Sequence, residues 1–206
     1  MTDLLHTHDL AVGYGQGRRK PLTLLSRIDV SIQAGELICL VGPNGAGKSP
    51  LLRTLGGLQP PLGGRVTVGG VDLYRLTPNE RARRIGMVLT GQPVNATMTG
   101  CALVALGRHP YTDWLGRLSA ADYTVVDWAI DAVNGTAFAP RPLAELSDGQ
   151  RQKLFIARAL AQEPDLLLLD EPTAFLDLPR RIEIMRLLHR LARTTGRAIM
   201  LSTHDL

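Results

Sequence analysis

Hydrophobic residues along this chain follow two periods, and segments of each kind alternate. Short apolar runs typical of strands occur at "LLHTHDLAVGY", "LLSRIDVSI", "ELICLVG", "LLLLD" and "AIMLSTH". A helical period is clearest over 180–193, where one stripe contains Ile184, Leu187, Leu188 and Leu191. Strands alternating with helices predict an α/β fold with a mostly parallel sheet at its core and further strands near the N-terminus.

Turn and capping residues mark the boundaries of these elements. "GRVTVGGVDL" alternates as a hairpin would, and Gly56 and Gly57 end a short helix that follows "ELICLVG". In "LTPNERARRIGMVL", Thr77 is a good N-cap, Pro78 suits the first helical position and Glu80 completes a capping box. This segment predicts a short basic helix that leads into the strand "IGMVL".

The strand patterns stop between about residues 90 and 145, where helical segments replace them. The clearest is "SAADYTVVDWAIDAV", which opens with Ser119 and Asp122. We therefore expect a single domain over 1–206, with an α/β core formed by 1–89 and 151–206 and a helical subdomain at 90–150.

The composition excludes several classes of protein. The chain has 206 residues, of which 45% are hydrophobic and 20% are charged, as in ordinary soluble globular proteins. Its net charge of +4 is modest and spread out, so it does not indicate a nucleic-acid partner. The two cysteines lack metal-ligand spacing, and Cys39 is expected in the core. With no signal-peptide pattern and no apolar run near the ~20 residues that cross a membrane, the sequence predicts a cytosolic protein.

The first candidate functional motif is a glycine-rich loop directly after a predicted buried strand. It matches the phosphate-loop pattern G-x-x-x-x-G-K-[ST] in its required context, through Gly42, Pro43, Asn44, Gly45, Ala46, Gly47, Lys48 and Ser49. Its backbone N–H groups and the following helix N-terminus would hold phosphate oxygens. Lys48 would reach the β- and γ-phosphates, and the Ser49 hydroxyl would bind Mg²⁺.

Pro50 follows this loop and predicts a weakened phosphate site. Proline in the first helical turn breaks no helical hydrogen bond, so the fold should tolerate it. It disfavours the helical conformation of Ser49 and removes an N–H from the region of the α-phosphate. The expected penalty on nucleotide binding is roughly 1.5–3 kcal/mol, from one or two lost hydrogen bonds.

Two carboxylates at the end of "LLLLDEP" supply the second half of such a site. Asp170 should lie at the carboxyl edge of a strand, where α/β sheets bind ligands, and can hold Mg²⁺. Glu171 could polarise an attacking water molecule. An apolar strand ending in Asp-Glu is weak evidence alone, since many strands end that way.

With the region "LSDGQRQKLFIARALAQEPDLLLLDEPTAFLD", the sequence resembles the ATP-binding-cassette (ABC) ATPases, and the resemblance spans residues 4 to 206 with the motifs in the same order. Their signature motif appears with Ser147, Gly149 and Gln150, their D-loop ends at Asp177, and their switch histidine is His204. Tyr14 matches the aromatic residue that stacks on adenine in that family. The resemblance implies ATP and Mg²⁺ as ligands, and a head-to-tail homodimer in which each signature closes on the partner's γ-phosphate. Ser147 can also simply N-cap the helix 148–162.

Within that superfamily, "LVALGRHPYTDWLGRLSAAD" is similar to importer ATPases for iron-siderophores, haem and cobalamin. This similarity implies a membrane permease partner, an indirect link to a substrate-binding protein, and a position on the inner face of the cell membrane. Tyr111 and Trp114 could contact the permease or pack the helical subdomain. A soluble non-transport ABC ATPase and a catalytically weak nucleotide-binding subunit remain alternatives.

Three features depart from the family pattern. The glutamine that links Mg²⁺ to the permease interface could be Gln92, shifted from its usual position, or Thr90 could occupy its place. Asp148 replaces the first glycine of the signature and adds negative charge close to an incoming triphosphate. The chain stops two residues after His204, where the family continues with strands and a helix, so we expect a missing sheet edge.

Overall fold

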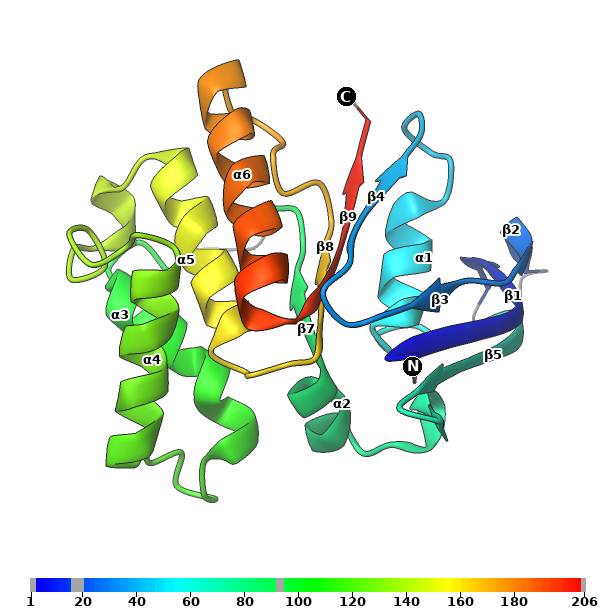
Figure 1. Cartoon of the computed structure of the whole chain (residues 1–206), viewed down its shortest axis with the longest axis horizontal. Helices are drawn as coiled ribbons and strands as arrows, with labels where there is room; N and C mark the ends of the chain where they lie inside the picture. The colour runs from blue at the N-terminus through cyan, green and yellow to red at the C-terminus, as the bar shows by residue number, and fades with distance from the viewer. Residues whose placement is uncertain (1–2, 16–20, 92–94, 205–206) are drawn as a thin grey trace.

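The computed structural model describes residues 3–15, 21–91 and 95–204, and it contains two sheets (Figure 1). An antiparallel sheet has the order β2-β1-β5-β6, with β3 also paired to β1. Its strands are β1 (Leu5–Tyr14), β2 (Leu22–Ile28), β3 (Ser31–Ile32), β5 (Gly63–Val68) and β6 (Val71–Asp72). A parallel sheet has the order β4-β9-β8-β7, formed by β4 (Leu37–Val41), β7 (Ile85–Val88), β8 (Leu166–Leu169) and β9 (Ala198–Thr203).

Six α-helices accompany these sheets in the described residues. They are α1 (Lys48–Leu55), α2 (Pro78–Arg84), α3 (Gly100–Ala105), α4 (Ala120–Ala132), α5 (Asp148–Leu160) and α6 (Leu178–Thr195). Short 3₁₀ segments are η1 (Leu73–Arg75), η2 (Leu106–Tyr111) and η3 (Leu143–Glu145). Both the parallel core and the helical segment predicted after residue 90 are therefore present. Within the described ranges, no helix has the length and apolarity that crossing a bilayer requires.

The two central strands of the parallel sheet are buried on both faces and separate two cores. Because successive strand side chains point to opposite faces, Leu167, Leu169, Ile199 and Leu201 pack with α5 and α6. The alternate residues Leu166, Leu168, Ala198 and Met200 pack with α1 and the antiparallel sheet. Helices α1 and α5 thus cover opposite faces of one sheet (Figure 1).

Capping boxes fix the start of three of the described helices. Thr77 and Glu80 form the predicted capping box at α2, and Ser119 and Asp122 form one at α4. A third capping box joins Ser147 to the N3 residue of α5, Gln150. The predicted N-caps are confirmed, because each hydroxyl accepts a hydrogen bond from a backbone N–H that has no partner within its helix.

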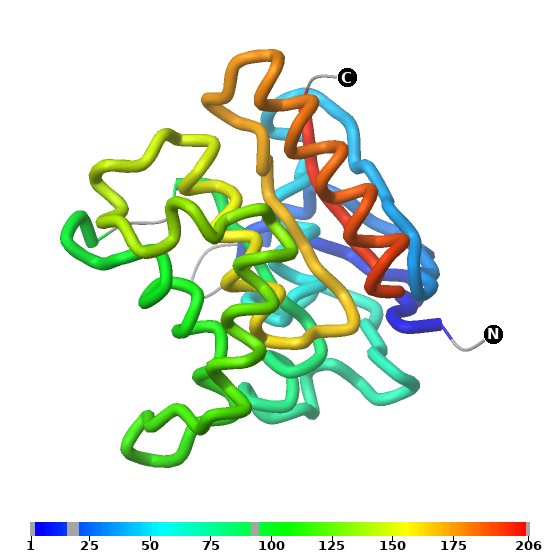
Figure 2. The backbone as a smooth tube through the Cα atoms, turned by 60° about the vertical axis from the view of Figure 1, so that its left-hand side comes forward, coloured from blue at the N-terminus to red at the C-terminus, as the bar shows by residue number. Residues whose placement is uncertain are grey.

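The prediction that Cys39 is buried in the core is wrong. In the described residues β4 pairs only with β9, so it forms one edge of the parallel sheet, and Cys39 is an exposed free thiol. The apolar run of β4 resembles a strand buried on both sides, but tertiary packing covers it only in part. Helix α6 lies beside β4 and β9 (Figure 2). Between α6 and these strands is a mostly apolar cavity of about 620 Å³, and its lining includes Leu37, Cys39 and Met185.

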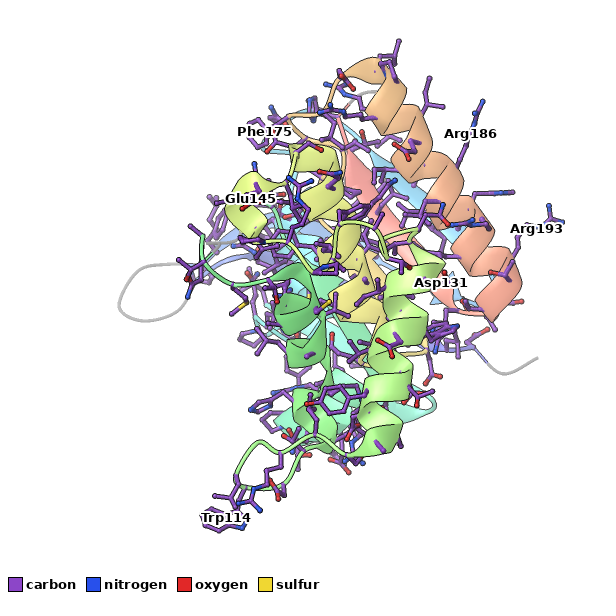
Figure 3. All side chains as sticks on the ribbon, turned by 90° about the vertical axis from the view of Figure 1, so that its left-hand side faces the viewer. Trp114, Asp131, Glu145, Phe175, Arg186 and Arg193 are labelled. Carbon is purple, nitrogen blue, oxygen red and sulfur yellow. The ribbon has the colours of Figure 1, made fainter. Side chains whose placement is uncertain are left out.

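One buried arginine, Arg108, links several elements of the helical region. Arg108 donates from Nε to Asp122 Oδ1 at 2.9 Å and from Nη1 to the Ala161 carbonyl at 2.8 Å and to Glu163 Oε2 at 2.7 Å. The Tyr111 ring lies between the Arg108 and Arg83 guanidinium carbons, which are 3.9 and 4.6 Å from its centroid. Tyr111 therefore packs inside this region, whereas Trp114 is 90% exposed at its tip (Figure 3).

We expect the Asp122 carboxylate to contribute stability that is lost in acid. Hydrogen bonds from Ser119, and then the Arg108 guanidinium, hold the pKa of Asp122 at about 2 in the folded chain. Because this pKa is below the unfolded value of about 3.9, the contribution is complete above that value and disappears as the pH falls through about 2. Asp122→Asn should therefore cost about 1–3 kcal/mol at pH 7 and much less at pH 2.

Urea denaturation of both chains at pH 7 and at pH 2–3 measures this difference. Asp127→Asn is the control, because Asp127 is an exposed residue of the same helix. Equal costs of Asp122→Asn at the two pH values would contradict the prediction.

Candidate functional site

The predicted site residues gather where the parallel strands end. The loop 42–49 follows β4, Thr90 follows β7, Asp170 and Glu171 follow β8, and His204 follows β9. All four strands run in the same direction, so their carboxyl ends form one edge of the sheet (Figure 1). Ligands of open α/β sheets bind at that edge.

The glycine-rich loop forms the turn that phosphate binding requires. Gly45 and Gly47 have φ of 82° and 91°, a left-handed conformation that residues with a Cβ rarely adopt. The buried Lys48 begins α1, and its ammonium donates to the Gly42 carbonyl at 2.6 Å and to the Pro43 carbonyl at 3.0 Å. The loop thus surrounds the Lys48 ammonium, next to the N-terminus of an eight-residue helix.

Pro50 does not disturb this helix. It is the third residue of α1, and the hydrogen bond nearest to it runs from the Leu51 N–H to the Gly47 carbonyl at 2.9 Å. A residue at that position has no intrahelical acceptor for its own N–H, so α1 loses no bond. The prediction that the fold tolerates Pro50 is confirmed. Pro50 has no N–H to donate at the helix N-terminus, where a bound anion would accept hydrogen bonds.

Asp170 is the buried centre of the site, with 4% of its surface exposed. Its Oδ1 accepts from the Ser49 hydroxyl at 2.9 Å and from the Ser202 hydroxyl at 2.8 Å. Carboxylate and hydroxyl oxygens are the hard ligands that Mg²⁺ prefers, and Ser49 and Asp170 already lie within hydrogen-bonding distance. These two residues therefore fit the predicted metal site.

Glu171 lies between two groups that can carry positive charge. Its Oε1 is 4.0 Å from Lys48 Nζ and 3.5 Å from His204 Nδ1. The backbone of Glu171 has a φ of 48°. Its N–H donates to the Ser202 hydroxyl at 2.9 Å, which holds this conformation. A strained backbone held by its surroundings is typical of residues that must point in a fixed direction at a functional site.

Two hydroxyl residues at this edge contribute contacts that a motif search does not assign. Ser202 is fully buried in β9 and bridges Asp170 and the Glu171 N–H. Thr90 donates to the Asp170 backbone carbonyl at 2.6 Å. In the sequence, only the polar end of the apolar run "AIMLST" indicates that Ser202 could lie at this site. Thr90 therefore occupies the end of β7 next to Asp170, while Gln92 lies outside the described residues.

The signature residues begin α5, on the opposite face of the sheet from α1. The Ser147 N–H donates to Gln150 Oε1 at 3.0 Å, and the Gln150 N–H donates to Ser147 Oγ at 3.3 Å, which completes the cap. Gly149 is buried beside Arg180, and Asp148 pairs with Arg151, which offsets part of its negative charge. Asp177 caps the next helix, accepting from Arg180 N at 3.1 Å. Each residue thus has a structural role in the isolated chain.

Tyr14 lies on the hairpin that borders the phosphate loop. It ends β1, is 55% exposed and pairs with Leu22 of β2. A Cβ on Gly47 would lie 3.3 Å from Leu24 and 3.1 Å from Leu25 of the same strand. An exposed ring beside a phosphate loop is well placed to stack on a flat base.

A family model described as "ABC transporter" matches residues 25–174. This match covers most of the chain, and it includes the phosphate loop, the signature and Asp170. The chain belongs to the ABC transporter ATP-binding family. It is an ATPase cassette, and the resemblance to the importer members of this family is confirmed.

Three curated relatives extend this assignment. An ABC transporter ATP-binding protein of Methanocaldococcus jannaschii is 43% identical over 98% of this chain and 68% of its own length. The iron(3+)-hydroxamate import ATP-binding protein of Bacillus subtilis is 36% identical over 98% of this chain and 73% of its own length. The cobalamin import ATP-binding protein of Halobacterium salinarum is 42% identical over 89% of this chain and 46% of its own length.

A solved cassette has the same fold. It is a dimeric, post-hydrolysis ATP-binding cassette bound to ADP and phosphate, with 28% identity, a TM-score of 0.79, and alignment over 98% of this chain and 88% of that one. The expected cassette fold is therefore confirmed.

Replacing Pro50 should strengthen ATP binding. Pro50→Thr restores an N–H and adds a hydroxyl at the start of α1, which should raise ATP affinity by roughly 10- to 100-fold, as one or two phosphate hydrogen bonds imply. Pro50→Ala restores only the N–H and should recover part of the gain. Isothermal titration with ATP measures both, and an affinity of Pro50→Thr within twofold of the parent would contradict the prediction.

Proposed function

We propose that this chain is the ATP-hydrolysing subunit of an ABC importer that takes up an iron chelate (a siderophore or haem) or cobalamin. The observation that carries the proposal is the joint placement of Lys48, Asp170, Glu171 and His204 at one sheet edge. Relatives named as iron-hydroxamate and cobalamin import proteins support the importer class. We propose ATP as the substrate and Mg²⁺ as the cofactor.

In this proposal each residue at the edge has one role in hydrolysis. The loop 42–47 and Lys48 hold the phosphates, and Tyr14 stacks on the adenine. Ser49 and Asp170 would hold Mg²⁺, which when bound neutralises phosphate charge. Glu171 orients a water molecule and draws its proton while the water oxygen attacks the γ-phosphorus; the bond to the bridging oxygen breaks, releasing ADP and phosphate. His204 positions the same phosphate.

The active unit in this proposal is a head-to-tail homodimer. Helices α1 and α5 cover opposite faces of one sheet, so a single chain cannot readily direct both N-termini at one triphosphate. A second copy can supply Ser147, Gly149 and Gln150, with Asp177 nearby, to the phosphates held by the first. The dimeric cassette with ADP and phosphate supports this arrangement.

A groove at the other end of α1 is the proposed permease contact. It has a volume of about 350 Å³, and its lining includes Gly57, Leu58, Arg81, Leu106 and Arg158. Leu58 and Leu106 are 60% and 53% exposed, so they present apolar surface at the groove. It lies between the end of α1 and the helical subdomain that we assign to 90–150. An amphipathic helix from a permease fits such a surface. This contact would hold the chain at the inner face of the membrane. The substrate-binding protein of the same system would lie on the outer side.

Steady-state ATPase activity of the purified chain tests the catalytic part of the proposal. Glu171→Gln should lower turnover at least about 100-fold, because it removes the base that draws the proton from water. Glu183→Gln is the control, as that carboxylate pairs with Lys153 at 2.5 Å on the flank of α6. If the parent chain and Glu171→Gln bind ATP but hydrolyse it equally slowly, the chain is a catalytically weak nucleotide-binding subunit.

Coexpression with the polytopic membrane subunit of the same transport system tests the importer part. Leu106→Glu puts a charge in the groove, so it should abolish copurification while leaving the ATPase activity of the isolated chain within twofold. Tyr123→Glu changes an aromatic residue that is 57% exposed and does not line the groove, and it should copurify normally. Copurification of Leu106→Glu at the parental level would contradict the groove assignment, and a chain that hydrolyses ATP but binds no membrane subunit would be a soluble non-transport ATPase.

A further inference from the structure

Ser202 is a polar residue in a strand that is buried along its whole length. Every residue of β9 is buried, and Ser202 has no exposed surface. The strand lies between β4 and β8 (Figure 1), so both of its edges are paired. Burying a hydroxyl costs free energy unless it forms hydrogen bonds, and alanine or valine would avoid that cost. What Ser202 contributes must therefore lie in its hydrogen bonds.

The Ser202 hydroxyl connects the two carboxylate residues at the end of β8. It donates to Asp170 Oδ1 at 2.8 Å and accepts from the Glu171 N–H at 2.9 Å. A serine hydroxyl has one proton to donate, whereas a carboxylate can only accept and a backbone N–H can only donate. The Ser202 proton therefore points to Asp170, and a lone pair faces the Glu171 N–H. Asp170 thus fixes the direction in which Ser202 accepts.

The backbone of Glu171 has to be held, because its conformation is unfavourable by itself. Its φ of 48° lies in the left-handed region, which a residue with a Cβ rarely adopts. The direction of the side chain depends on this backbone conformation. Glu171 Oε1 lies 3.5 Å from His204 Nδ1 and 4.0 Å from Lys48 Nζ. Loss of the Ser202 hydrogen bond would therefore move the carboxylate relative to both groups.

The part of the site that holds phosphates has contacts that do not depend on Ser202. Asp170 Oδ1 also accepts from the Ser49 hydroxyl at 2.9 Å, and the Asp170 N–H donates to the Val88 carbonyl at 2.8 Å. The ammonium of Lys48 has its own hydrogen bonds to two carbonyls of the phosphate loop. Removing the Ser202 hydroxyl should therefore disturb Glu171 more than the rest of the site.

We propose that Ser202 is a positioning residue for the reaction. Its hydroxyl, directed by Asp170, fixes the backbone of Glu171 so that the carboxylate points at the attacking water molecule. This inference rests on the proposed function, in which Glu171 is the base. A misplacement of a reacting group by about 1 Å can cost roughly 100-fold in rate. Loss of the hydroxyl should therefore lower kcat and leave ATP affinity nearly unchanged.

Steady-state ATPase kinetics, together with isothermal titration of a non-hydrolysable ATP analogue, test this split. Ser202→Ala should lower kcat about 10- to 100-fold and change KM and analogue affinity less than about threefold. Ser202→Thr and Ser202→Val introduce side chains of nearly the same shape, so any overpacking affects both alike. The kcat of Ser202→Thr should exceed that of Ser202→Val at least about tenfold, because only threonine keeps the hydroxyl. Equal kcat values for these two variants would overturn the proposal.

Thr54→Val is the matched control for the loss of a buried hydroxyl. Thr54 is fully buried in α1, and its side-chain hydroxyl has no hydrogen-bond partner among the residues that the structure describes. This variant should keep kcat within twofold of the parent chain. A loss as large as that of Ser202→Val would overturn the specific role of Ser202.

A double-mutant cycle with Glu171→Gln separates positioning from a merely structural role. If Ser202 acts through the base, Ser202→Ala should change the single-turnover hydrolysis rate less than about twofold once Glu171→Gln has removed that base. An equal loss in both backgrounds would overturn the proposal, because a structural defect does not depend on the base. If Glu171→Gln lowers turnover but Ser202→Ala does not, only this inference fails. If Glu171→Gln hydrolyses ATP as fast as the parent chain, the proposed function fails and the inference fails with it.

Discussion

The hydrogen bonds around Asp170 are the interaction on which the rest of this site depends. The carboxylate accepts from Ser49 at the start of α1 and from Ser202 at the end of β9, and its backbone carbonyl accepts from Thr90 beyond β7. One buried residue thus connects the ends of three strands and the phosphate loop. A buried carboxylate with unsatisfied oxygens would be costly, so these contacts hold the loops in one arrangement.

The parallel sheet is buried on both faces, because alternate side chains of its central strands belong to two separate hydrophobic cores. Its central strands must separate α1 from α5, since each helix presents its N-terminus at the same edge from the opposite side. The layered fold therefore places α1 and α5 on opposite faces of one sheet. In the proposed homodimer, a second copy supplies Ser147 to the phosphates that the first copy holds.

The helical region lies between the nucleotide edge and the groove that we propose as the permease contact. Thr90 ties the end of β7 to Asp170, and the chain continues from there into α3 and η2. Arg108 and the stacked Tyr111 fasten η2 to α4 and to the turn after α5, beside the groove that contains Leu106.

The sequence alone determined the elements and the chemistry of this protein. Local capping boxes defined the starts of α2 and α4, because their hydrogen bonds span only three residues, and the spacing of the phosphate-loop motif selected Lys48 and Ser49. Tertiary structure alone decided that Cys39 is exposed, since an apolar strand looks the same at an edge and in the middle of a sheet. It also decided that Ser202 and Thr90 hold Asp170, because those partners lie 32 and 80 residues away along the chain and only strand order brings them together.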